Sequence, residues 1–334
     1  MKKILIIRTD RLGDVILTTP IAGALKKRYS DCRVTFWVKE YTKEIVENCN
    51  FIDSVITFPE NKGLLKIIRK IKKEKFDISI LVHPSFKLAL IIFLAQIPIR
   101  IGTGFRVYSF LFNKRWYEHR KYSILHEVDY NLNLLKTLEI EENNPEFSFR
   151  ISPEAENHVE KLLIKLGINK EEKIIVLHPG SGRSAPGWSF KNFSILSDSL
   201  IDSGYTVLIT GGKNDRKIVE KLLKNCKKKP FVLTDILNLK ELMALLKRVK
   251  IFVSNSTGPL HLAVALGTTV LGLYPPLVTA SIRRWGPYNK KEFTLTPEIP
   301  ECKKCIKEKC KYYDCMNLIK TETVFNKIIS LIGN

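Results

Sequence analysis

Four short stretches of this sequence combine glycine with side chains that do chemistry. The first is residues 8–14, Arg-Thr-Asp-Arg-Leu-Gly-Asp. A carboxylate held there, Asp10 or Asp14, is suited to take a proton from a substrate hydroxyl, and the neighbouring arginines would keep it ionised. The alternative is that one of these aspartates caps the helix that follows. The residues themselves leave both the role and the choice of aspartate open.

The second stretch is residues 178–184, His-Pro-Gly-Ser-Gly-Arg-Ser. Small residues between a strand and a helix expose backbone N–H groups that can approach a phosphate. The candidate ligand-binding residues here are Ser181, Gly182, Arg183 and Ser184. The stretch is neither a dinucleotide fingerprint nor a Walker P-loop, so a glycine-rich turn without a ligand is the alternative.

The other two stretches are residues 210–215 and 255–261. In residues 210–215, Asp215 is suited to hold a ribose hydroxyl, or it simply occupies the first turn of its helix. The second offers another loop of small residues that leads into a helix. Its candidate anion or sugar contacts are Ser256, Thr257, Gly258 and His261, with the histidine one turn into the helix.

Short β-rich runs alternate with amphipathic helical patterns, which predicts parallel sheets built from βαβ units. The pattern dissolves near residues 141–153 and then starts again, so we expect two similar α/β halves. Thr19, directly before Pro20, is predicted to cap a helix. The strands expected from the pattern are 3–8, 33–38, 54–58, 76–82, 173–178, 205–210, 231–234, 250–254 and 269–274. All four chemical stretches follow such strands, and ligands of parallel sheets bind beyond the carboxyl ends of strands.

The chain has 334 residues, 45% of them hydrophobic, which is enough for two packed domains and excludes a disordered or collagen-like chain. Its formal net charge of +21 indicates an anionic partner. A nucleic-acid partner is poorly supported, because the positive charge is the only evidence for it and the sequence contains no recognised nucleic-acid-binding motif. The apolar runs after Met1 and at residues 88–99 are too short for a signal peptide or a membrane span, so we expect a cytoplasmic protein.

Four of the seven cysteines lie close together near the C-terminus: Cys302, Cys305, Cys310 and Cys315. Four thiolates would suit a structural zinc ion, although the usual paired C-x2-C spacing is only half met. Reduced thiols that pack a loop are the favoured alternative, since disulfides are rare in a reducing cytoplasm.

The order and spacing of these motifs resemble glycosyltransferase family 9, the heptosyltransferases of lipopolysaccharide core assembly, over nearly the whole chain. The segments that carry the resemblance are residues 3–8, Leu12-Gly13-Asp14, Thr18-Thr19-Pro20, His178-Pro179-Gly180-Ser181 with Trp188, Gly211-Gly212, residues 257–263 and Arg284-Trp285-Gly286-Pro287.

This resemblance implies a GT-B fold, in which two Rossmann-like domains face one another across a cleft. Residues 1–150 would form the acceptor-binding domain and residues 151–334 the nucleotide-sugar-binding domain, with a last helix at about 324–332 that crosses back to the first domain. The family aspartate matches Asp14, which implies that Asp14 rather than Asp10 is the general base of an inverting transfer. The resemblance further implies no metal and no cofactor, with ADP-heptose as donor substrate and a lipopolysaccharide core as acceptor.

Two departures from the family pattern stand out. Pro186 occupies the position of a common family lysine, which shifts phosphate neutralisation to Arg183, Lys191 or Lys213, with Arg183 favoured. Ser256 replaces a common aspartate and makes the donor sugar less certain than glycosyl transfer itself. The alternatives are a GT-B enzyme for another nucleotide sugar, an epimerase, or a catalytically silent protein that binds a nucleotide sugar.

Basic residues crowd the first half of the chain. An acceptor that carries phosphates at an anionic leaflet would attract such a surface, so the resemblance also predicts peripheral contact with the cytoplasmic face of the inner membrane. The alternative is a solvated lysine-rich helix face. The residues concerned are Lys62, Lys66, Arg69, Lys70, Lys72, Lys73, Lys75, Arg100, Arg106, Lys114 and Arg115.

Overall fold

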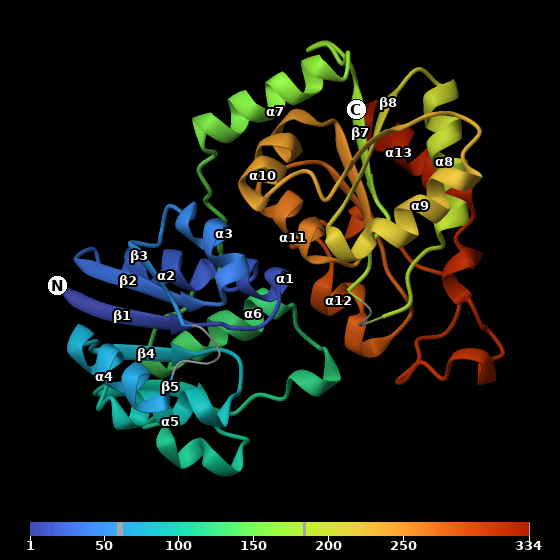
Figure 1. Cartoon of the computed structure of the whole chain (residues 1–334). Coiled ribbons are helices and arrows are strands. Elements are labelled where there is room, and N and C mark those ends of the chain that lie inside the picture. Colours follow the sequence, from blue (N-terminus) through green and yellow to red (C-terminus); the bar gives the residue numbers. More distant parts are fainter. Residues whose placement is uncertain (59–62, 183–184, 334) are drawn as a thin grey trace. The chain divides into compact units, whose positions relative to one another are not determined.

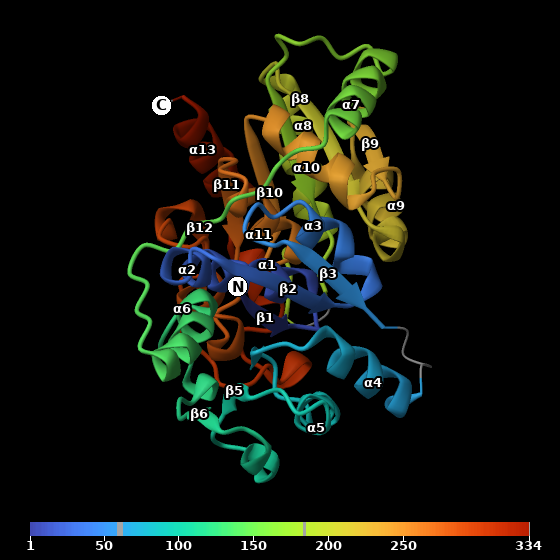
Figure 2. The same ribbon diagram turned by 90° about the vertical axis from the view of Figure 1, so that its left-hand side faces the viewer.

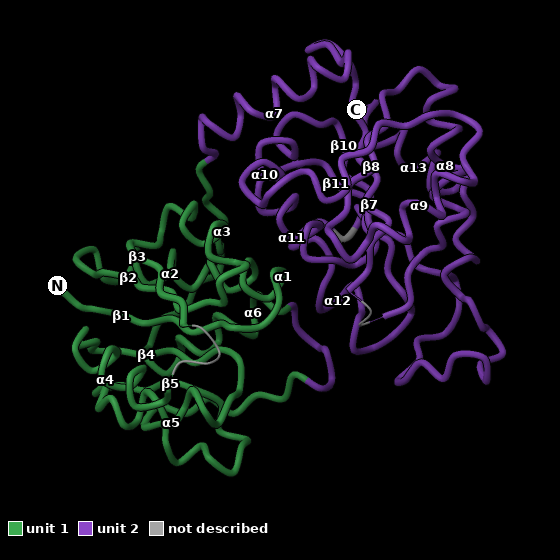
Figure 3. Tube along the Cα trace, in the orientation of Figure 1, with its two compact units in different colours: residues 1–120, 127–150 green, residues 121–126, 151–334 purple. Residues whose placement is uncertain are grey.

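A computed structural model describes residues 1–58, 63–182 and 185–333 of the chain (Figure 1). The chain divides into two compact units, coloured separately in Figure 3. Unit 1 comprises Met1–Arg120 and Glu127–Arg150, and unit 2 comprises Lys121–His126 and Ile151–Asn334.

Unit 1 is built on a parallel sheet whose strand order is β3-β2-β1-β4-β5-β6 among the described residues. The central strand β1 reads as an unbroken apolar run because helices cover both faces of such a sheet, and its residues Ile4–Ile7 are fully buried. The strands are β1 (Lys2–Ile7), β2 (Cys32–Val38), β3 (Ser54–Thr57), β4 (Ile78–Leu81), β5 (Ile99–Thr103) and β6 (Lys114–Trp116).

The helices of unit 1 cover this sheet. Side chains of α4 and α5 form one core with β1 and β4, and Figures 1 and 2 both show these two helices side by side along the sheet. The α-helices are α1 (Leu12–Ile16), α2 (Pro20–Arg28), α3 (Lys43–Glu47), α4 (Leu64–Glu74), α5 (Phe86–Leu94) and α6 (Glu127–Leu132), and the 3₁₀ helices are η1 (Glu40–Thr42), η2 (Val107–Leu111), η3 (Arg120–Tyr122) and η4 (Asn133–Leu138).

Unit 2 repeats the same architecture with a parallel sheet in the order β12-β11-β10-β7-β8-β9 within the described part of the chain. The strands are β7 (Ile174–His178), β8 (Thr206–Gly211), β9 (Phe231–Thr234), β10 (Ile251–Asn255), β11 (Val270–Leu273) and β12 (Thr294–Leu295). The prediction of two parallel, Rossmann-like α/β domains is therefore confirmed.

Helices α8, α9 and α13 pack on one face of this sheet in a single hydrophobic core. The α-helices are α7 (Pro153–Lys165), α8 (Phe190–Asp202), α9 (Arg216–Asn225), α10 (Leu239–Arg248), α11 (Gly258–Ala265), α12 (Ile282–Trp285) and α13 (Thr321–Ile332), and the 3₁₀ helices are η5 (Lys213–Asp215), η6 (Val278–Ala280), η7 (Lys291–Phe293), η8 (Lys307–Lys309) and η9 (Cys315–Leu318).

The structure differs from the sequence expectation at the short segment 121–126. The sequence analysis places it in the N-terminal domain with the rest of residues 1–150, whereas the structure groups it with unit 2. Two hydrogen bonds hold it there: Arg283 Nε donates to the Ser123 carbonyl at 2.8 Å, and His126 Nε2 lies 2.8 Å from the Gly286 carbonyl oxygen.

The last helix, α13, packs against α8 within unit 2. Its fully buried Val324 and Ile328 lie in the core of that unit, so the apolar face of α13 is used there. That residues 324–332 cross back to the N-terminal domain stays a prediction.

The predicted capping role of Thr19 is wrong. The residue does precede α2, but its side chain makes no capping hydrogen bond, because its hydroxyl donates instead to the Ile16 carbonyl at 2.8 Å. Separately, none of the helices in the described residues combines the length and the apolar character that a membrane span requires.

Candidate active site

The first candidate stretch lies at the carboxyl end of β1 in unit 1, where the chain turns into α1. Arg8 directly follows the strand and its side chain is almost fully buried. Its guanidinium forms an ion pair with Asp14 in the first turn of α1, donates from Nε to Asp10 at 2.8 Å, and lies 3.2 Å from Glu127 Oε1. One arginine thus gathers three carboxylates.

Two residues of α6 that were not predicted from the sequence complete this cluster. Glu127 is fully buried and also pairs with Arg120. Asn131, one helical turn later, accepts from Arg8 at 3.3 Å and donates to the Leu17 carbonyl at 2.9 Å. The only available signal was that α6 carries Glu127 and Asn131 at i and i+4, so that both lie on one side of the helix.

Asp14 has the electrostatics of a base that works near neutral pH. Burial raises the pKa of Asp14 to about 6. Arg8 opposes this rise, while Asp10 and Glu127 add to it. The side chain is 14% exposed, and among the described residues Arg8 is its one hydrogen-bond partner, through Oδ1. The other carboxylate oxygen has no hydrogen bond to the described residues.

Asp10, the other sequence candidate, has both carboxylate oxygens engaged. Its Oδ1 accepts from Arg8 Nε at 2.8 Å, and its Oδ2 lies 3.2 Å from His83 Nδ1. Burial lowers the pKa of His83, while Asp10 opposes that shift. The backbone carbonyl of Asp10 accepts from the Tyr41 hydroxyl at 2.6 Å. Asp10 is therefore suited to position Arg8 and the loop rather than to take a proton.

In unit 2, the loops that follow β7 and β8 are joined through Asp215. Its Oδ2 accepts from the Gly212 N–H at 2.8 Å, and a Cβ placed on Gly180 would lie 2.6 Å from its carboxylate. A Cβ at position 180 would therefore force the Asp215 carboxylate to move while the two loops stay this close. Asp215 lies in η5, immediately before α9, as the alternative reading of a helix-start residue anticipated.

His178, at the end of β7, is a buried structural residue. Its Nδ1 lies 3.1 Å from the Thr210 hydroxyl at the end of β8. Burial lowers the pKa of His178 to about 4, against the opposing charge of Asp215. The imidazole is therefore neutral at physiological pH and contributes no positive charge to an anion site.

Asn255, at the end of β10, clamps the loop that contains Ser181 and Gly182. It is buried, accepts from the Trp188 N–H at 2.7 Å, and donates to the Pro179 carbonyl at 3.1 Å. Sequence reasoning did not single out this asparagine, although it begins the fourth chemical stretch. It holds both ends of the loop against the carboxyl end of β10.

The fourth stretch forms the start of α11. Thr257 is the N-cap residue but its side chain makes no capping hydrogen bond, because its hydroxyl lies 2.9 Å from that of Ser254. The first turn of α11, from Gly258, thus begins without a side-chain cap. A helix start of this kind is suited to an anion, because its N–H groups and its dipole both favour negative charge.

Ser256 and His261 lie near the buried aromatic residues of unit 2. Burial raises the pKa of Tyr274, and the Ser256 side chain hydrogen-bonds to this tyrosine. The Tyr274 hydroxyl donates to the Trp285 carbonyl at 2.7 Å. The His261 ring, also buried, lies 6.2 Å from that of Trp285 between centroids. The start of α11 is thereby connected to the Arg-Trp-Gly-Pro motif.

Two predicted contacts, Arg183 and Ser184, lie outside the described residues. Of the other predicted donor contacts, Ser181 is half-buried and Gly182 is exposed. The two basic alternatives to Arg183, Lys191 and Lys213, are exposed in the first turns of α8 and η5. The structure therefore groups Ser181, Gly182, Asp215, Ser256, Thr257, Gly258 and His261 at the carboxyl ends of β7, β8 and β10 in unit 2, while Asp14 belongs to unit 1.

The four clustered cysteines lie in an irregular segment of unit 2 as free thiols. Burial raises the pKa of Cys302 and of Cys315, and the neighbouring cysteines add to both shifts. Within the described ranges, no group of three or more His, Cys, Asp or Glu side chains is arranged to hold a metal ion.

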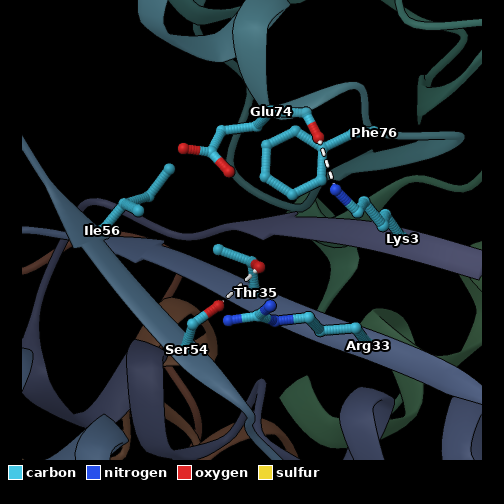
Figure 4. A pocket seen from close by; sticks show the side chains of 7 residues that line it. All are labelled: Lys3, Arg33, Thr35, Ser54, Ile56, Glu74 and Phe76. Atoms are coloured by element: carbon cyan, nitrogen blue, oxygen red, sulfur yellow. Dashed lines mark hydrogen bonds between the residues drawn. The ribbon is translucent and has the colours of Figure 1, made fainter.

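A pocket of about 180 Å³ lies in unit 1, at the end of the sheet where β1 begins (Figure 4). Three of its polar side-chain groups already have partners, because Lys3 Nζ donates to the Glu74 carbonyl at 3.1 Å and the hydroxyls of Thr35 and Ser54 lie 2.7 Å apart. None of the residues that line it was predicted to do chemistry. The lining residues are Lys3, Arg33, Thr35, Ser54, Ile56, Glu74 and Phe76.

Comparison with known proteins connects this chain to one family. The model of glycosyltransferase family 9 (heptosyltransferase) matches residues 64–315. Among curated proteins, lipopolysaccharide heptosyltransferase 3 of Escherichia coli is 24% identical over 286 residues, covering 78% of this chain and 79% of that protein.

Solved structures share the fold along the whole chain. A family 9 glycosyltransferase from Veillonella parvula superposes with a TM-score of 0.86 at 24% identity, covering 99% of this chain and 97% of that one. The ADP-heptose lipopolysaccharide heptosyltransferase II of Escherichia coli superposes with a TM-score of 0.81 at 19% identity, covering 99% and 98%. The expectation of a GT-B fold is confirmed.

Proposed function

The chain belongs to glycosyltransferase family 9, and we propose that it transfers a heptose from ADP-heptose to a lipopolysaccharide core acceptor with inversion at the anomeric carbon. The similarity to lipopolysaccharide heptosyltransferase 3 supports this choice of sugar and acceptor. Such an acceptor is anchored in lipid, so we place the reaction at the cytoplasmic face of the inner membrane, in peripheral contact with it.

In the proposed reaction, Asp14 accepts the proton of an acceptor hydroxyl while that oxygen attacks the anomeric carbon of the donor. The new carbon–oxygen bond forms on the face opposite the bond to the diphosphate, which breaks and releases ADP. The observation that carries this role is the single engaged oxygen of Asp14 together with its pKa of about 6, which leaves it mostly ionised at pH 7 and still basic.

On the donor side, we assign the diphosphate to the start of α11 and the loop after β7. The hydroxyl of Thr257 is turned toward Ser254, so this side chain does not compete with a phosphate for the first N–H groups of the helix. Asp215 would hold a ribose hydroxyl. The GT-B resemblance implies no catalytic metal, so helix starts and a basic side chain offset the charge of the leaving diphosphate.

We take Arg183 as that basic side chain, with Lys191 and Lys213 as the alternatives. Arg183→Ala should then weaken ADP binding, as measured by calorimetry, and Lys191→Ala and Lys213→Ala serve as matched controls. An unchanged affinity in Arg183→Ala, with a loss in one of the lysine variants, would reassign the phosphate contact.

The experiment that tests the proposed function compares Asp14→Asn with Asp10→Asn in a transfer assay with ADP-heptose and a lipopolysaccharide core acceptor. We expect Asp14→Asn to lower kcat by about 10²–10⁴-fold while ADP affinity is retained, because a positioned general base contributes that much. Asp10→Asn should lower kcat less, because the amide oxygen of the asparagine can still accept a hydrogen bond from Arg8. Near-normal turnover of Asp14→Asn would remove Asp14 from the role.

A second candidate is transfer of a different sugar from another nucleotide. The observation in its favour is Ser256, which stands where the family commonly has aspartate and instead hydrogen-bonds to Tyr274. Hydrolysis and transfer assays with a panel of nucleotide sugars test this: a donor used better than ADP-heptose would establish it. Binding without turnover of any donor would indicate a silent nucleotide-sugar-binding protein.

A further inference from the structure

Helix α5 of unit 1 presents an apolar outward face. Phe86, Phe93 and Leu94 are 54%, 41% and 43% exposed. At 100° per residue these three side chains lie on one side of the helix, opposite the side chains that α5 buries in the core. A helix on the surface of a globular protein normally carries polar residues on that outward side.

The neighbouring η2 extends this face. Helix α5 packs against η2, and the ring centroids of Phe86 and Tyr108 lie 5.7 Å apart. On η2, Val107 is 97% exposed and Phe110 is 66% exposed. We call Phe86, Phe93, Leu94, Val107 and Phe110 the apolar surface. Exposed apolar side chains grouped on two packed elements indicate an interaction site.

Exposed basic side chains flank the apolar surface. The outward face of α4, which packs against α5 (Figures 1 and 2), carries five of them and one exposed acidic residue, Glu74. Others lie on α5, next to η2 and along β6. We call these residues the basic rim: Lys66, Arg69, Lys70, Lys72, Lys73, Lys87, Arg106, Lys114 and Arg115.

We propose that the apolar surface and the basic rim together bind an anionic lipid bilayer. The apolar side chains enter the headgroup region, and the basic rim contacts the lipid phosphates, as in other peripheral membrane proteins that combine buried apolar area with electrostatic attraction. The charge complementarity selects this partner over a second copy of the chain, because a symmetric dimer through this surface would bring one basic rim against another.

The surface also lies close in the chain to the acidic cluster of unit 1. Helix α5 begins at Phe86, three residues after His83, whose Nδ1 lies 3.2 Å from Asp10. Docking through α5 would therefore hold the carboxyl edge of this sheet near the bilayer that contains the acceptor. This use of the surface rests on the proposed function, whereas the binding of the bilayer does not.

The test is cosedimentation of the full chain with vesicles of phosphatidylcholine, with and without the anionic lipid phosphatidylglycerol. The wild-type chain should bind the anionic vesicles and only weakly the neutral ones, and salt should weaken the binding. Val107→Ser with Phe110→Ser should reduce the partitioning of the chain onto anionic vesicles about tenfold or more. The reason is that two apolar side chains that would be buried in the bilayer are removed. The matched control is Ile164→Ser with Ile195→Ser, two exposed apolar residues of unit 2.

A second pair of variants tests the basic rim. Arg69→Glu with Lys73→Glu, one turn apart on α4, should reduce the partition about thirtyfold or more. The matched control is Lys161→Glu with Lys165→Glu, which has the same spacing and charge change on the exposed side of α7. Equal losses in the control variants, or equal binding of neutral and anionic vesicles, would overturn the proposal.

The oligomeric state and turnover separate the remaining outcomes. If Val107→Ser with Phe110→Ser alters sedimentation velocity of the chain without lipid and leaves vesicle binding unchanged, the surface joins two copies and the proposal is wrong. Transfer to a lipid-free acceptor fragment should be unchanged in these variants. Transfer without vesicle binding by the wild-type chain contradicts the docking surface and the proposed membrane contact but not the proposed transfer reaction. Vesicle binding without transfer contradicts the transfer reaction alone.

Discussion

Arg8 forms a buried ion pair with Asp14, yet the pKa of Asp14 is raised to about 6 instead of being lowered. Burial is the largest cause, and the carboxylates of Asp10 and Glu127 add to it because they share the same guanidinium. Their charges in turn raise the pKa of Arg8, against the opposing effect of burial, so the arginine stays charged. This arrangement keeps a base in position without removing its basicity.

The first prediction concerns the pH dependence of turnover. If Asp14 is the base, kcat/KM should rise about tenfold per pH unit below pH 6 and level off above it, because the ionised form is the active one. Glu127→Gln should shift this inflection to lower pH, since it removes a negative charge that raises the pKa of Asp14. Glu47→Gln, an exposed change on α3, is the control and should leave the profile in place. If the inflection stays at the same pH in Glu127→Gln, the pH profile does not report the ionisation of Asp14 in this cluster.

The second prediction concerns stability. The pKa of Asp14 is about 6 in the folded chain against an ordinary value of 3.8, so folding favours the protonated form. Above pH 6 the ionised Asp14 carboxylate therefore lowers the free energy of unfolding. This loss disappears below the ordinary pKa of 3.8, where the carboxyl group is protonated in both states. Asp14→Asn should raise the free energy of unfolding by about 1–3 kcal/mol at pH 8 and leave it unchanged near pH 3. Urea unfolding at both values checks this, and a loss of stability at pH 8 would contradict it.

The third prediction concerns Arg8 as the centre of the cluster. Arg8→Met should cost about 3–5 kcal/mol in the free energy of unfolding at pH 7, because it leaves buried carboxylates without their partner. Lys43→Met is the control: it removes an exposed ion pair with Glu47 and should cost less than about 1 kcal/mol. Equal losses in the two variants would mean that the buried pairs do not stabilise unit 1.

The sequence predicted the strands on either side of the candidate site because buried parallel strands are continuous apolar runs. It did not predict the contact of Arg8 with Glu127, which joins residues 119 positions apart. No local pattern marks that contact, because α6 turns its acidic and amide side chains toward the sheet rather than toward solvent. Asp10 and Asp14 were found together, and only the geometry shows that Asp10 has both oxygens engaged.

Helices α5 and α13 show why the remaining elements were harder to predict. The outward face of α5 is mostly apolar, so its sequence reads as an apolar run interrupted only by Lys87, without the helical period. The family resemblance implied a helix at about 324–332, but the apolar face of α13 specifies only that it is buried, not on which sheet. Its packing against α8 is decided by tertiary contacts with residues far from it in the chain.

The last prediction concerns the joined loops of unit 2. Gly180→Ala places a Cβ 2.6 Å from the Asp215 carboxylate, which must rotate and give up its hydrogen bond to the Gly212 N–H. We expect a loss of about 1–3 kcal/mol in the free energy of unfolding and weaker ADP binding. Gly212→Ala is the matched control, since its Cβ would lie 3.8 Å from Asp215 Oδ2 and its backbone φ is −84°.

A double-mutant cycle shows whether the clash with Asp215 is the cause. If it is, Gly180→Ala combined with Asp215→Ala should be no less stable than Asp215→Ala alone, because the crowded carboxylate is gone. Additive losses would mean that the alanine strains the loop itself. If ADP affinity also stays low in the double variant and in Asp215→Ala, while Gly212→Ala binds normally, the carboxylate contributes to donor binding beyond its structural hydrogen bond.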